Sequence, residues 1–158
     1  MIPRVGIGYD VHKLGKDRNL CIGGIIIPHN KGCIAHSDGD VLIHAICDAL
    51  LGAAGKRDIG IHFPDTSEKY KDIDSKILLK KVNELIKKED FKIGNIDSVI
   101  CLEKPKIKEY IPEMINTLAT LLEISPEQIA IKPTTTETLG FIGAEQGISA
   151  YATVLIFK

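Results

Sequence analysis

Hydrophobic and polar residues along the chain follow two spacings, one typical of strands and one typical of helices. Alternating or β-branched apolar runs predict strands over residues 4–12, 21–22, 25–27, 96–102, 129–131 and 148–157. Apolar residues spaced by three and four predict amphipathic helices over residues 38–51, 77–86 and 114–122. The predicted order is therefore strands, helix, helix, strand, helix, strand, strand.

This order predicts an α+β fold, in which helices pack on one face of a mixed β-sheet. The last segment, 148–157, carries apolar side chains on both of its faces, with Tyr151 and Leu155 on one and Val154 on the other. If helices cover one face, the second apolar face must be buried by another subunit. We therefore expect an oligomer.

Local signals mark the ends of several elements. Asp38 precedes the first apolar turn of the 38–51 helix and is predicted to be its N-cap. Pro112 fits near a helix start, and Ser125 to Gln128 resembles a capping-box turn between a helix and a strand.

Length and charge narrow the class of protein. With 158 residues, 44% of them hydrophobic, the chain can bury a core of its own, and no linker divides residues 1–158, so we expect a single domain. The formal net charge of −1 provides no basic surface for a polyanion, and no nucleic-acid partner is expected. No apolar run approaches the roughly 18 residues of a membrane span, so no membrane partner is expected either.

The cysteines and the N-terminal residues suggest a cellular compartment. The four cysteines show no Cys-x-x-Cys spacing and are expected to be reduced, mostly buried side chains. The first residues form neither a secretory nor a transit pattern. We expect a soluble protein of the bacterial cytoplasm, or of a plastid-type organelle if a transit segment was removed.

Three side chains form a candidate metal site. Asp10 and His12 stand two residues apart in a predicted strand, so both point to one face and can reach a single ion. His44 lies on the predicted helix that follows an acid-rich turn, where Asp40 could orient a ligand imidazole. One carboxylate and two imidazoles suit zinc, with a fourth tetrahedral position left for water or a substrate oxygen.

Two of the polar patterns have alternative interpretations. Asp40, His44 and Asp48 are spaced by four along one helix face, and such a stripe can also be an ordinary solvent-facing surface. The Thr-Thr-Thr-Glu run at 134–137 can donate hydrogen bonds to phosphate oxygens and hold a hard cation such as Mg²⁺. The same run can equally be a strand end with capping threonines.

Several short motifs follow one another in a specific order. They are Gly8-Tyr9-Asp10-Val11-His12, Ala35-His36-Ser37-Asp38-Gly39-Asp40, Asp48-Ala49-Leu50-Leu51-Gly52-Ala53, Asp58-Ile59-Gly60, Phe63-Pro64-Asp65, Thr134-Thr135-Thr136-Glu137 and Leu139-Gly140-Phe141. As a set they closely resemble the 2-C-methyl-D-erythritol 2,4-cyclodiphosphate synthases, the cyclases of the non-mevalonate isoprenoid pathway. The resemblance spans residues 4–157 without large insertions.

The resemblance implies a metal-dependent lyase. Such an enzyme converts 4-diphosphocytidyl-2-C-methyl-D-erythritol 2-phosphate into 2-C-methyl-D-erythritol 2,4-cyclodiphosphate and CMP by intramolecular phosphoryl transfer. Asp10, His12 and His44 would bind Zn²⁺ or a similar divalent ion, and Glu137 would bind Mg²⁺ or Mn²⁺ across the diphosphate. The family is a homotrimer with active sites between subunits, in agreement with the two-faced strand.

The resemblance also implies roles for the residues around the metals. His36 and Thr135 would be catalytic, because they would stabilise the transition state, and Ser37 would join His36 at the methylerythritol phosphate. The substrate-binding residues implied in this way are Ser37, Asp48, Asp58, Gly60, Phe63, Asp65, Pro105, Lys106, Thr134, Thr136 and Phe141.

Three parts of the substrate are assigned to different segments. Asp58 and Gly60 would bind the cytidine ribose. Pro105 and Lys106, within residues 102–108, would line the cytosine pocket. Asp65 would lie in the loop that binds the methylerythritol.

The chain departs from the family pattern after Phe141. Many members carry an arginine where this chain has Ala144, followed by a glycine and a glutamate where this chain has Glu145 and Gln146. A phosphate or central-cavity contact by that arginine, and terpenoid binding along the trimer axis, are therefore not carried over to this chain.

Two other functions fit part of the pattern. A zinc-dependent hydrolase would use the open coordination position for an activated water, although the chain has no His-Glu-x-x-His motif. A non-catalytic binding trimer stabilised by zinc would also need the Asp and His ligands. Release of CMP and formation of a cyclic diphosphate distinguish the cyclase from both.

Overall fold

The structure is a computed structural model that describes residues 2–64 and 66–158. Its elements in chain order are β1 (Pro3–Lys16), β2 (Leu20–Ile22), β3 (Ile25–Ile27), β4 (Lys31–Ile34), α1 (Val41–Ala53), α2 (Ile59–His62), α3 (Ser75–Lys88), β5 (Lys92–Cys101), α4 (Ile111–Leu122), β6 (Ile129–Thr134), α5 (Gly140–Gly143) and β7 (Gly147–Phe157), with short 3₁₀ turns at Glu68–Tyr70, Lys108–Tyr110 and Pro126–Gln128.

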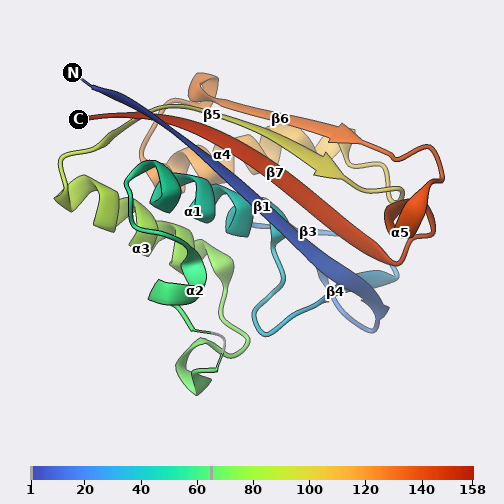
Figure 1. Ribbon diagram of the computed structural model, residues 1–158. Coiled ribbons are helices and arrows are strands. Elements are labelled where there is room, and N and C mark those ends of the chain that lie inside the picture. The colour runs from blue at the N-terminus through green and yellow to red at the C-terminus, as the bar shows by residue number, and fades with distance from the viewer. Residues whose placement is uncertain (1, 65) are drawn as a thin grey trace.

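Five strands form one mixed sheet in the order β4-β1-β7-β5-β6, and β2 and β3 form a separate hairpin. Among the strands of the described residues, β5 and β6 are the one parallel pair, while β1 and β7 pair antiparallel along almost their whole lengths, from Pro3 opposite Phe157 to Lys13 opposite Gly147. The two termini therefore lie side by side at one end of the sheet (Figure 1). The predicted α+β class and mixed sheet are confirmed.

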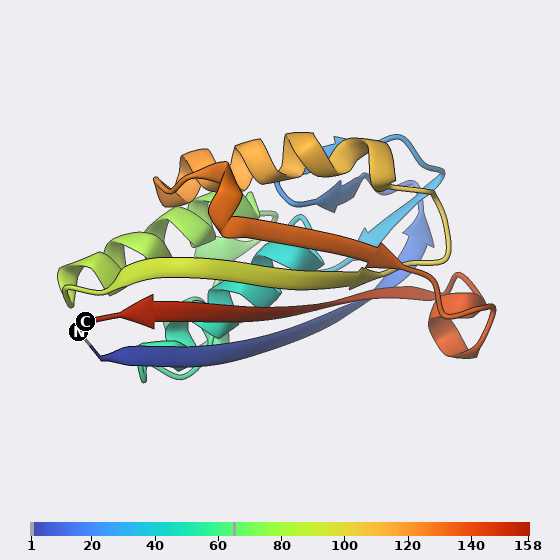
Figure 2. The same cartoon turned by 90° about the horizontal axis from the view of Figure 1, so that it is seen from above.

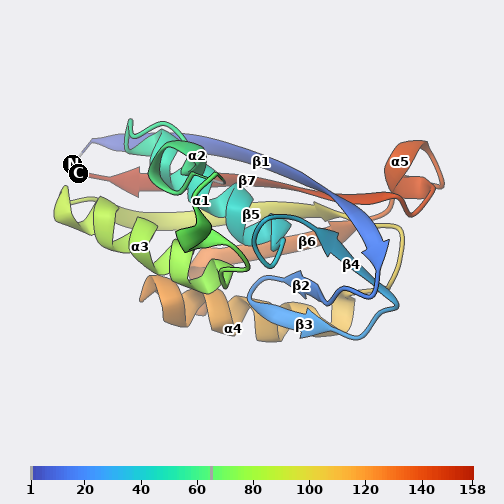
Figure 3. The ribbon, with the colours of Figure 1, turned by 90° about the horizontal axis from the view of Figure 1, so that it is seen from below.

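The long helices gather on one face of the sheet. α1 packs directly on β1 and β7, α3 packs against α1, and α4 lies beside β6 and α3. Figures 2 and 3 view the molecule from opposite sides. The helix α1 lies behind the strands in Figure 2 and in front of them in Figure 3, where α3 lies in front of β5 and α4 lies beside β6. The prediction that helices cover one face is confirmed.

The central helix α1 approaches the sheet unusually closely. Its residues are almost all buried, as expected of a helix that is apolar around most of its surface. Gly6 and Gly8 of β1 make this approach possible, because a Cβ atom at either position would lie 1.9 Å from the carbonyl oxygen of Ala49 or Ala45, respectively. Strand and helix backbones are therefore in direct contact beside the candidate metal ligands.

The predicted helix boundaries need one correction. The N-cap of α1 is Asp40, whose carboxylate accepts a hydrogen bond from the backbone amide of Ile43 at 3.0 Å, and the predicted cap Asp38 lies two residues earlier. Strand β4 and the short helices α2 and α5 were not predicted. Each of them is only four residues long, so hydrophobic spacing cannot indicate them.

Two signals near α4 are confirmed. Pro112 is the second residue of α4, and the backbone amide of Ser125 donates to the side-chain oxygen of Gln128 at 3.0 Å. Both signals depend only on contacts within a few residues, which is why the sequence is sufficient to predict them.

The other face of the sheet carries exposed apolar side chains in this single chain. Val5, Ile7, Tyr9 and Val11 of β1 lie on it, and Ile7 is 73% exposed. Tyr9 pairs across the strands with Tyr151 of β7, and their ring centroids are 4.7 Å apart. The predicted second apolar face therefore exists.

All four cysteine thiols are free, and burial raises the pKa of the Cys33 thiol to about 12. The Cys33 thiol is thus protonated near neutral pH, and the four free thiols agree with the prediction of reduced cysteines. Among the described residues, none of the helices combines the length and the hydropathy needed to cross a membrane.

Candidate active site

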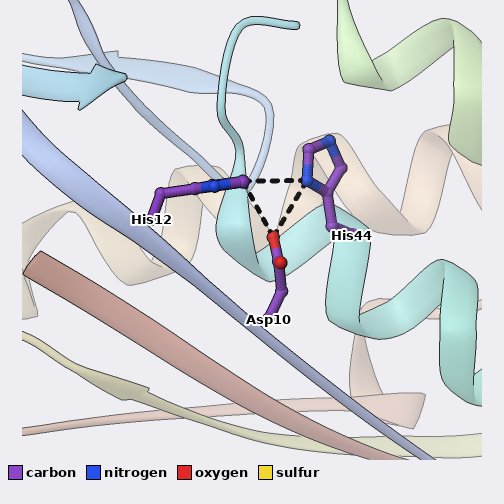
Figure 4. A group of neighbouring side chains, drawn as sticks. All are labelled: Asp10, His12 and His44. Atoms are coloured by element: carbon purple, nitrogen blue, oxygen red, sulfur yellow. Dashed lines mark hydrogen bonds and ion pairs between the residues drawn. The ribbon is translucent and has the colours of Figure 1, made fainter. Parts of the chain in front are cut away.

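The three predicted metal ligands converge on one point above the sheet. Asp10 and His12 project from the helix-covered side of β1, and His44 projects from the first turns of α1 toward them (Figure 4). Asp10 Oδ2 lies 2.9 Å from both His12 Nε2 and His44 Nδ1, and these two nitrogens are 3.2 Å apart. The prediction that the two strand residues share a face is confirmed.

This donor set fits a divalent ion. Donor atoms bound to tetrahedral zinc at about 2.0–2.1 Å lie roughly 3.3 Å from each other, close to the spacings seen here. Among the described residues, Asp10, His12 and His44 are the group of acidic, histidine and cysteine side chains placed to hold a metal ion. One oxygen and two nitrogens would leave a fourth position open toward the adjoining cavity.

The electrostatics of the trio favour an ionised carboxylate. Burial opposes ionisation of Asp10, but hydrogen bonds and Coulombic attraction from His12 and His44 outweigh it and lower the pKa of Asp10 to about 2. Burial likewise opposes protonation of His44, yet the hydrogen bond and charge of Asp10 raise its pKa above 6.5. A bound cation would take the place of the protons that these histidines otherwise share with Asp10.

Asp40 does not orient a ligand imidazole. Its side chain is fully buried and accepts hydrogen bonds from the backbone amides of Gly23, Gly24 and Ile43, at 3.0, 2.7 and 3.0 Å. Asp40 therefore caps α1 and anchors the turn of the β2-β3 hairpin. The expectation from helical spacing was wrong because the carboxylate turns away from His44 toward these amides.

The solvent-facing interpretation of the helix stripe is also wrong. Asp40 is 0% exposed and His44 is 6% exposed. Asp48, the third member of the stripe, is half-buried and accepts a hydrogen bond from the backbone amide of Ile59 at 2.8 Å. Asp48 thereby holds the start of α2 against α1.

A cavity of about 450 Å³ adjoins the trio. Several residues that the motifs singled out line it together with the metal ligands: His36, Ser37, Gly60 and Phe63. The His36 ring nitrogen Nε2 lies 3.3 Å from the carbonyl oxygen of Ser67, and Ser37 Oγ lies 3.3 Å from His44 Nε2. Segments from β1, α1, the 35–37 loop and α2 thus meet around one hollow beside the metal site.

Asp58 is the N-cap residue of α2. Its exposed carboxylate caps this short helix by accepting a hydrogen bond from the backbone amide of Ile61 at 3.2 Å. The cap presents Gly60 at the cavity edge. Asp65, assigned to the neighbouring loop, lies outside the described residues.

The Thr-Thr-Thr-Glu run lies elsewhere on the subunit. It follows β6, and β7 and β5 separate β6 from β1 in the sheet. The register runs from Val11 through Ser149 and Cys101 to Thr134. Three strand spacings of about 4.8 Å place the run roughly 14 Å from the strand that carries Asp10 and His12. Within one chain, these two groups do not converge.

The hydroxyl groups of the run make local hydrogen bonds. Thr135 Oγ1 donates to the Glu137 carboxylate at 3.2 Å, and Thr136 Oγ1 donates to the carbonyl oxygen of Leu139 at 2.7 Å. The backbone amide of Thr136 donates to Glu103 at 3.2 Å. Thr134 is the last residue of β6. The run is thus a strand end, and its exposed Glu137 carboxylate remains accessible to a ligand.

Pro105, Lys106 and Phe141 also lie away from the 450 Å³ cavity. Pro105 and Lys106 belong to the segment after β5, where Lys106 is exposed. Phe141 belongs to α5 and lines a second hollow that reaches His12. These residues therefore group with the threonine run at the far end of β5 and β6.

The departure from the family pattern lies in this same region. The Glu145 carboxylate pairs with the Lys104 ammonium at 3.1 Å, and its carbonyl oxygen accepts a hydrogen bond from Lys31 Nζ at 3.0 Å. Glu145 thereby connects the turn after α5 to the segment after β5. The positively charged side chain of the family pattern is missing at this position, which is Ala144.

Sequence analysis missed a buried residue that contacts His44. Ser75, the first residue of α3, is fully buried and places its hydroxyl 2.9 Å from His44 Nε2. Asp74, the N-cap residue before it, indicates a helix start, but nothing in the sequence indicates that this helix end reaches a residue 31 positions earlier.

Comparisons with known proteins agree with this site. The family model of the YgbB family matches residues 3–157. A protein of Bacteroides thetaiotaomicron named 2-C-methyl-D-erythritol 2,4-cyclodiphosphate synthase is 61% identical over 155 residues, which cover 98% of each chain. A protein of the same name from Fusobacterium nucleatum is 53% identical over 98% of this chain and 97% of the relative.

Solved structures show the same fold. The bifunctional IspDF of Campylobacter jejuni is similar with a TM-score of 0.95 and 40% identity over 98% of this chain, which spans 42% of that longer protein. The CDP complex of Plasmodium falciparum IspF has a TM-score of 0.86 and 37% identity, covering 98% of this chain and 96% of that one.

A 2C-methyl-D-erythritol-2,4-cyclodiphosphate synthase described as its CDP-bound form has a TM-score of 0.90 and 34% identity, covering 98% of this chain and 100% of that one. Family model, relatives and structures therefore agree over nearly the full length of the chain. The chain belongs to the YgbB family, the family of the 2-C-methyl-D-erythritol 2,4-cyclodiphosphate synthases.

Proposed function

We propose that this protein converts 4-diphosphocytidyl-2-C-methyl-D-erythritol 2-phosphate into 2-C-methyl-D-erythritol 2,4-cyclodiphosphate and CMP. The observation that carries the proposal is the cavity in which Asp10, His12 and His44 meet His36 and Ser37. The high identity to relatives that bear the name of this activity supports it.

The reaction requires positioning more than acid–base chemistry. An oxygen of the 2-phosphate attacks the β-phosphorus of the diphosphate in the same molecule, and the bond from that phosphorus to the bridging oxygen breaks as CMP leaves. Because the attacking phosphate is already an anion near neutral pH, no general base is needed. The protein must fold a polyanion onto itself and offset its negative charge.

In this proposal, Asp10, His12 and His44 would hold Zn²⁺ or a similar divalent ion, and Glu137 would hold Mg²⁺ or Mn²⁺. Such ions withdraw charge from phosphate oxygens and hold them in a reactive arrangement. The charge of Asp10 partly offsets that of its ion, while the two imidazoles bind as neutral ligands.

The side chains around the cavity then bind the substrate. His36 and Ser37 would donate hydrogen bonds to the methylerythritol phosphate, and His36 would stabilise charge that builds up during transfer. Asp58 and Gly60 would hold the ribose at the start of α2, a turn that Asp48 supports through the amide of Ile59.

The remaining residues would complete the site from another subunit. We assign Thr134 to Glu137, with Thr135 as the catalytic threonine, to the phosphates, and Pro105 and Lys106 to the cytosine. The separation of about 14 Å between the threonine run and β1 supports a site shared between copies of the chain. The exposed apolar face around Ile7 and Tyr9 supports a homotrimer that buries it.

The test combines product analysis with metal content. Wild-type protein with Zn²⁺, Mg²⁺ and substrate should release CMP and yield a cyclic diphosphate in the ³¹P NMR spectrum. His44→Ala should lose bound zinc and turnover together while its circular dichroism spectrum is retained. A hydrolysed ester as the product would instead identify a hydrolase, and turnover with bound zinc in the His44→Ala variant would refute the ligand assignment.

A further inference from the structure

The far side of the His44 ring makes a contact that the metal site does not use. His44 Nδ1 faces Asp10, whereas Nε2 lies 2.9 Å from Ser75 Oγ. Ser75 is fully buried at the first position of α3, so no bulk water competes for this hydrogen bond. Ser37 Oγ lies farther from Nε2, at 3.3 Å, and itself accepts from the amide of Gly39.

Asp38 determines how the Ser75 hydroxyl is used. Its Oδ2 accepts a hydrogen bond from the Ser75 backbone amide at 2.9 Å, and its Oδ1 accepts one from the Ser75 hydroxyl. A carboxylate only accepts, so the single hydroxyl proton of Ser75 points toward Asp38. The lone pairs of Ser75 Oγ are then left to accept a hydrogen bond from the N–H group at His44 Nε2.

We propose that Asp38 and Ser75 are positioning residues that keep His44 in the tautomer with a proton on Nε2. In this tautomer the lone pair of Nδ1 points toward Asp10 and His12, as a metal ligand requires. The inference rests on the proposed metal-binding role of His44. It assigns the orientation of this ligand to α3 and the 36–40 turn, and not to Asp40, whose oxygens are already taken by three backbone amides.

The first test measures zinc affinity by competition with a chromogenic chelator. Partners that orient a metal-bound histidine typically contribute about 10–100-fold to affinity, so Ser75→Ala and Asp38→Asn should each weaken Zn²⁺ binding by about that factor. Ser98→Ala is the matched control. Ser98 is another buried serine, and its hydroxyl donates to the carbonyl oxygen of Ala130 between β5 and β6. The Ser98→Ala variant should bind Zn²⁺ with the affinity of wild type.

The second test reads the tautomer in the wild-type protein and uses a variant only to assign the signals. Long-range ¹H–¹⁵N spectra of the zinc-loaded wild type should show His44 with its proton on Nε2, the signals being assigned by their absence in the His44→Ala variant. A proton on Nδ1, or wild-type affinity in the Ser75→Ala variant, would overturn this inference alone. Wild-type protein that binds no Zn²⁺ would overturn the proposed metal site and this inference together.

Discussion

The backbone of Gly8 in β1 lies directly against the carbonyl group of Ala45 in α1. A Cβ atom at Gly8 would be 1.9 Å from the Ala45 oxygen, a distance that only movement of the backbone could relieve. Gly8 stands two residues before Asp10, and Ala45 follows His44. The close approach therefore sets the separation between a metal ligand on the strand and a metal ligand on the helix.

Replacing Gly8 by alanine should disturb stability and metal binding together. Forcing α1 away from β1 is expected to cost about 1–3 kcal/mol, as for other overpacked sites, and to weaken Zn²⁺ binding because Asp10 and His44 move apart. Urea denaturation and zinc titration measure the two effects. Gly52→Ala is the control, since a Cβ atom there meets nothing closer than 4.0 Å and alanine favours the helix. Unchanged zinc affinity in the Gly8→Ala variant would contradict the argument.

Asp40 should be a major contributor to stability. Its buried carboxylate accepts hydrogen bonds from three backbone amides. The Asp40→Ala substitution therefore leaves these three donors without a partner in a site closed to water. A loss of about 3 kcal/mol in the free energy of unfolding is expected, since each unsatisfied buried group costs roughly 1–3 kcal/mol. Asp74→Ala, which removes the more exposed N-cap of α3, should cost only about 1 kcal/mol in the same denaturation experiment. Equal losses in the two variants would show that the buried network adds nothing to a simple cap.

The metal-free protein should show a pH dependence that originates in Asp10 and the two histidines beside it, His12 and His44, and the raised pKa of His44 sets its upper limit through the Asp10–His44 pair. The pKa of Asp10 is lowered to about 2, so its contribution is present above pH 3.8 and is lost as the pH falls toward 2. The pKa of His44 is raised, so its contribution is present below pH 6.5 and is lost as the pH rises through the folded-state value. The pair is thus strongest between these limits.

Asp10→Asn should therefore destabilise the metal-free protein by on the order of 2 kcal/mol at about pH 5, and by less at about pH 8.5. Burial also raises the pKa of Asp40, but its contribution cancels when variant and wild type are compared at each pH. Burial raises the pKa of Asp48 too, with smaller contributions from the charges of Asp58 and Asp10. Urea denaturation with a chelator present gives the two differences. A destabilisation that is the same at both pH values would rule out the pair as its source.

Glu137→Gln should separate the two proposed metals. The amide keeps the shape of the side chain but lacks the charge that a hard cation needs, so the rate should fall about 10²–10³-fold and lose its Mg²⁺ dependence. Zinc content should stay the same, because Asp10, His12 and His44 lie on other elements. Glu127→Gln, on an exposed turn before β6, is the control. An Mg²⁺ titration that matches wild type would remove Glu137 from the metal site.

Ile7→Asp should dissociate the proposed homotrimer. Ile7 is the most exposed of the β1 side chains on the open face, and a carboxylate there cannot be buried between subunits without a partner. Light scattering after gel filtration should show a monomer that still binds Zn²⁺ but no longer releases CMP. Ile77→Asp, at an exposed position of α3 on the helical side, should remain trimeric. A wild-type protein that is monomeric in solution would exclude the trimer.

Much of the fold depends on short-range patterns and could be predicted from them. Alternating residues of β1 face the helices, and α1 carries apolar residues at helical spacing; both spacings are visible in the sequence. The β4 strand and the helices α2 and α5 could not be predicted, because they are too short to show a period and form where the rest of the chain supports them.

Some features of the candidate site could likewise be predicted from the sequence, and others could not. Asp10 and His12 share a face because alternate strand residues always do, so the sequence by itself determined that they could bind one ion. The motif set likewise determined the family. Sequence spacing placed Asp40 beside the ligand His44, but only the packing of the hairpin against α1 decided that its carboxylate binds amides instead.

Only the tertiary structure revealed Ser75 and Asp38 behind His44, because α3 and the 36–40 turn meet through contacts between distant residues. It also decided that the threonine run lies three strands from β1, a distance set by the order of the strands in the sheet. Spacing along a chain specifies which side chains share a face of one element. Which elements lie side by side is decided by burial and hydrogen bonding over the whole molecule, and no local pattern contains that information.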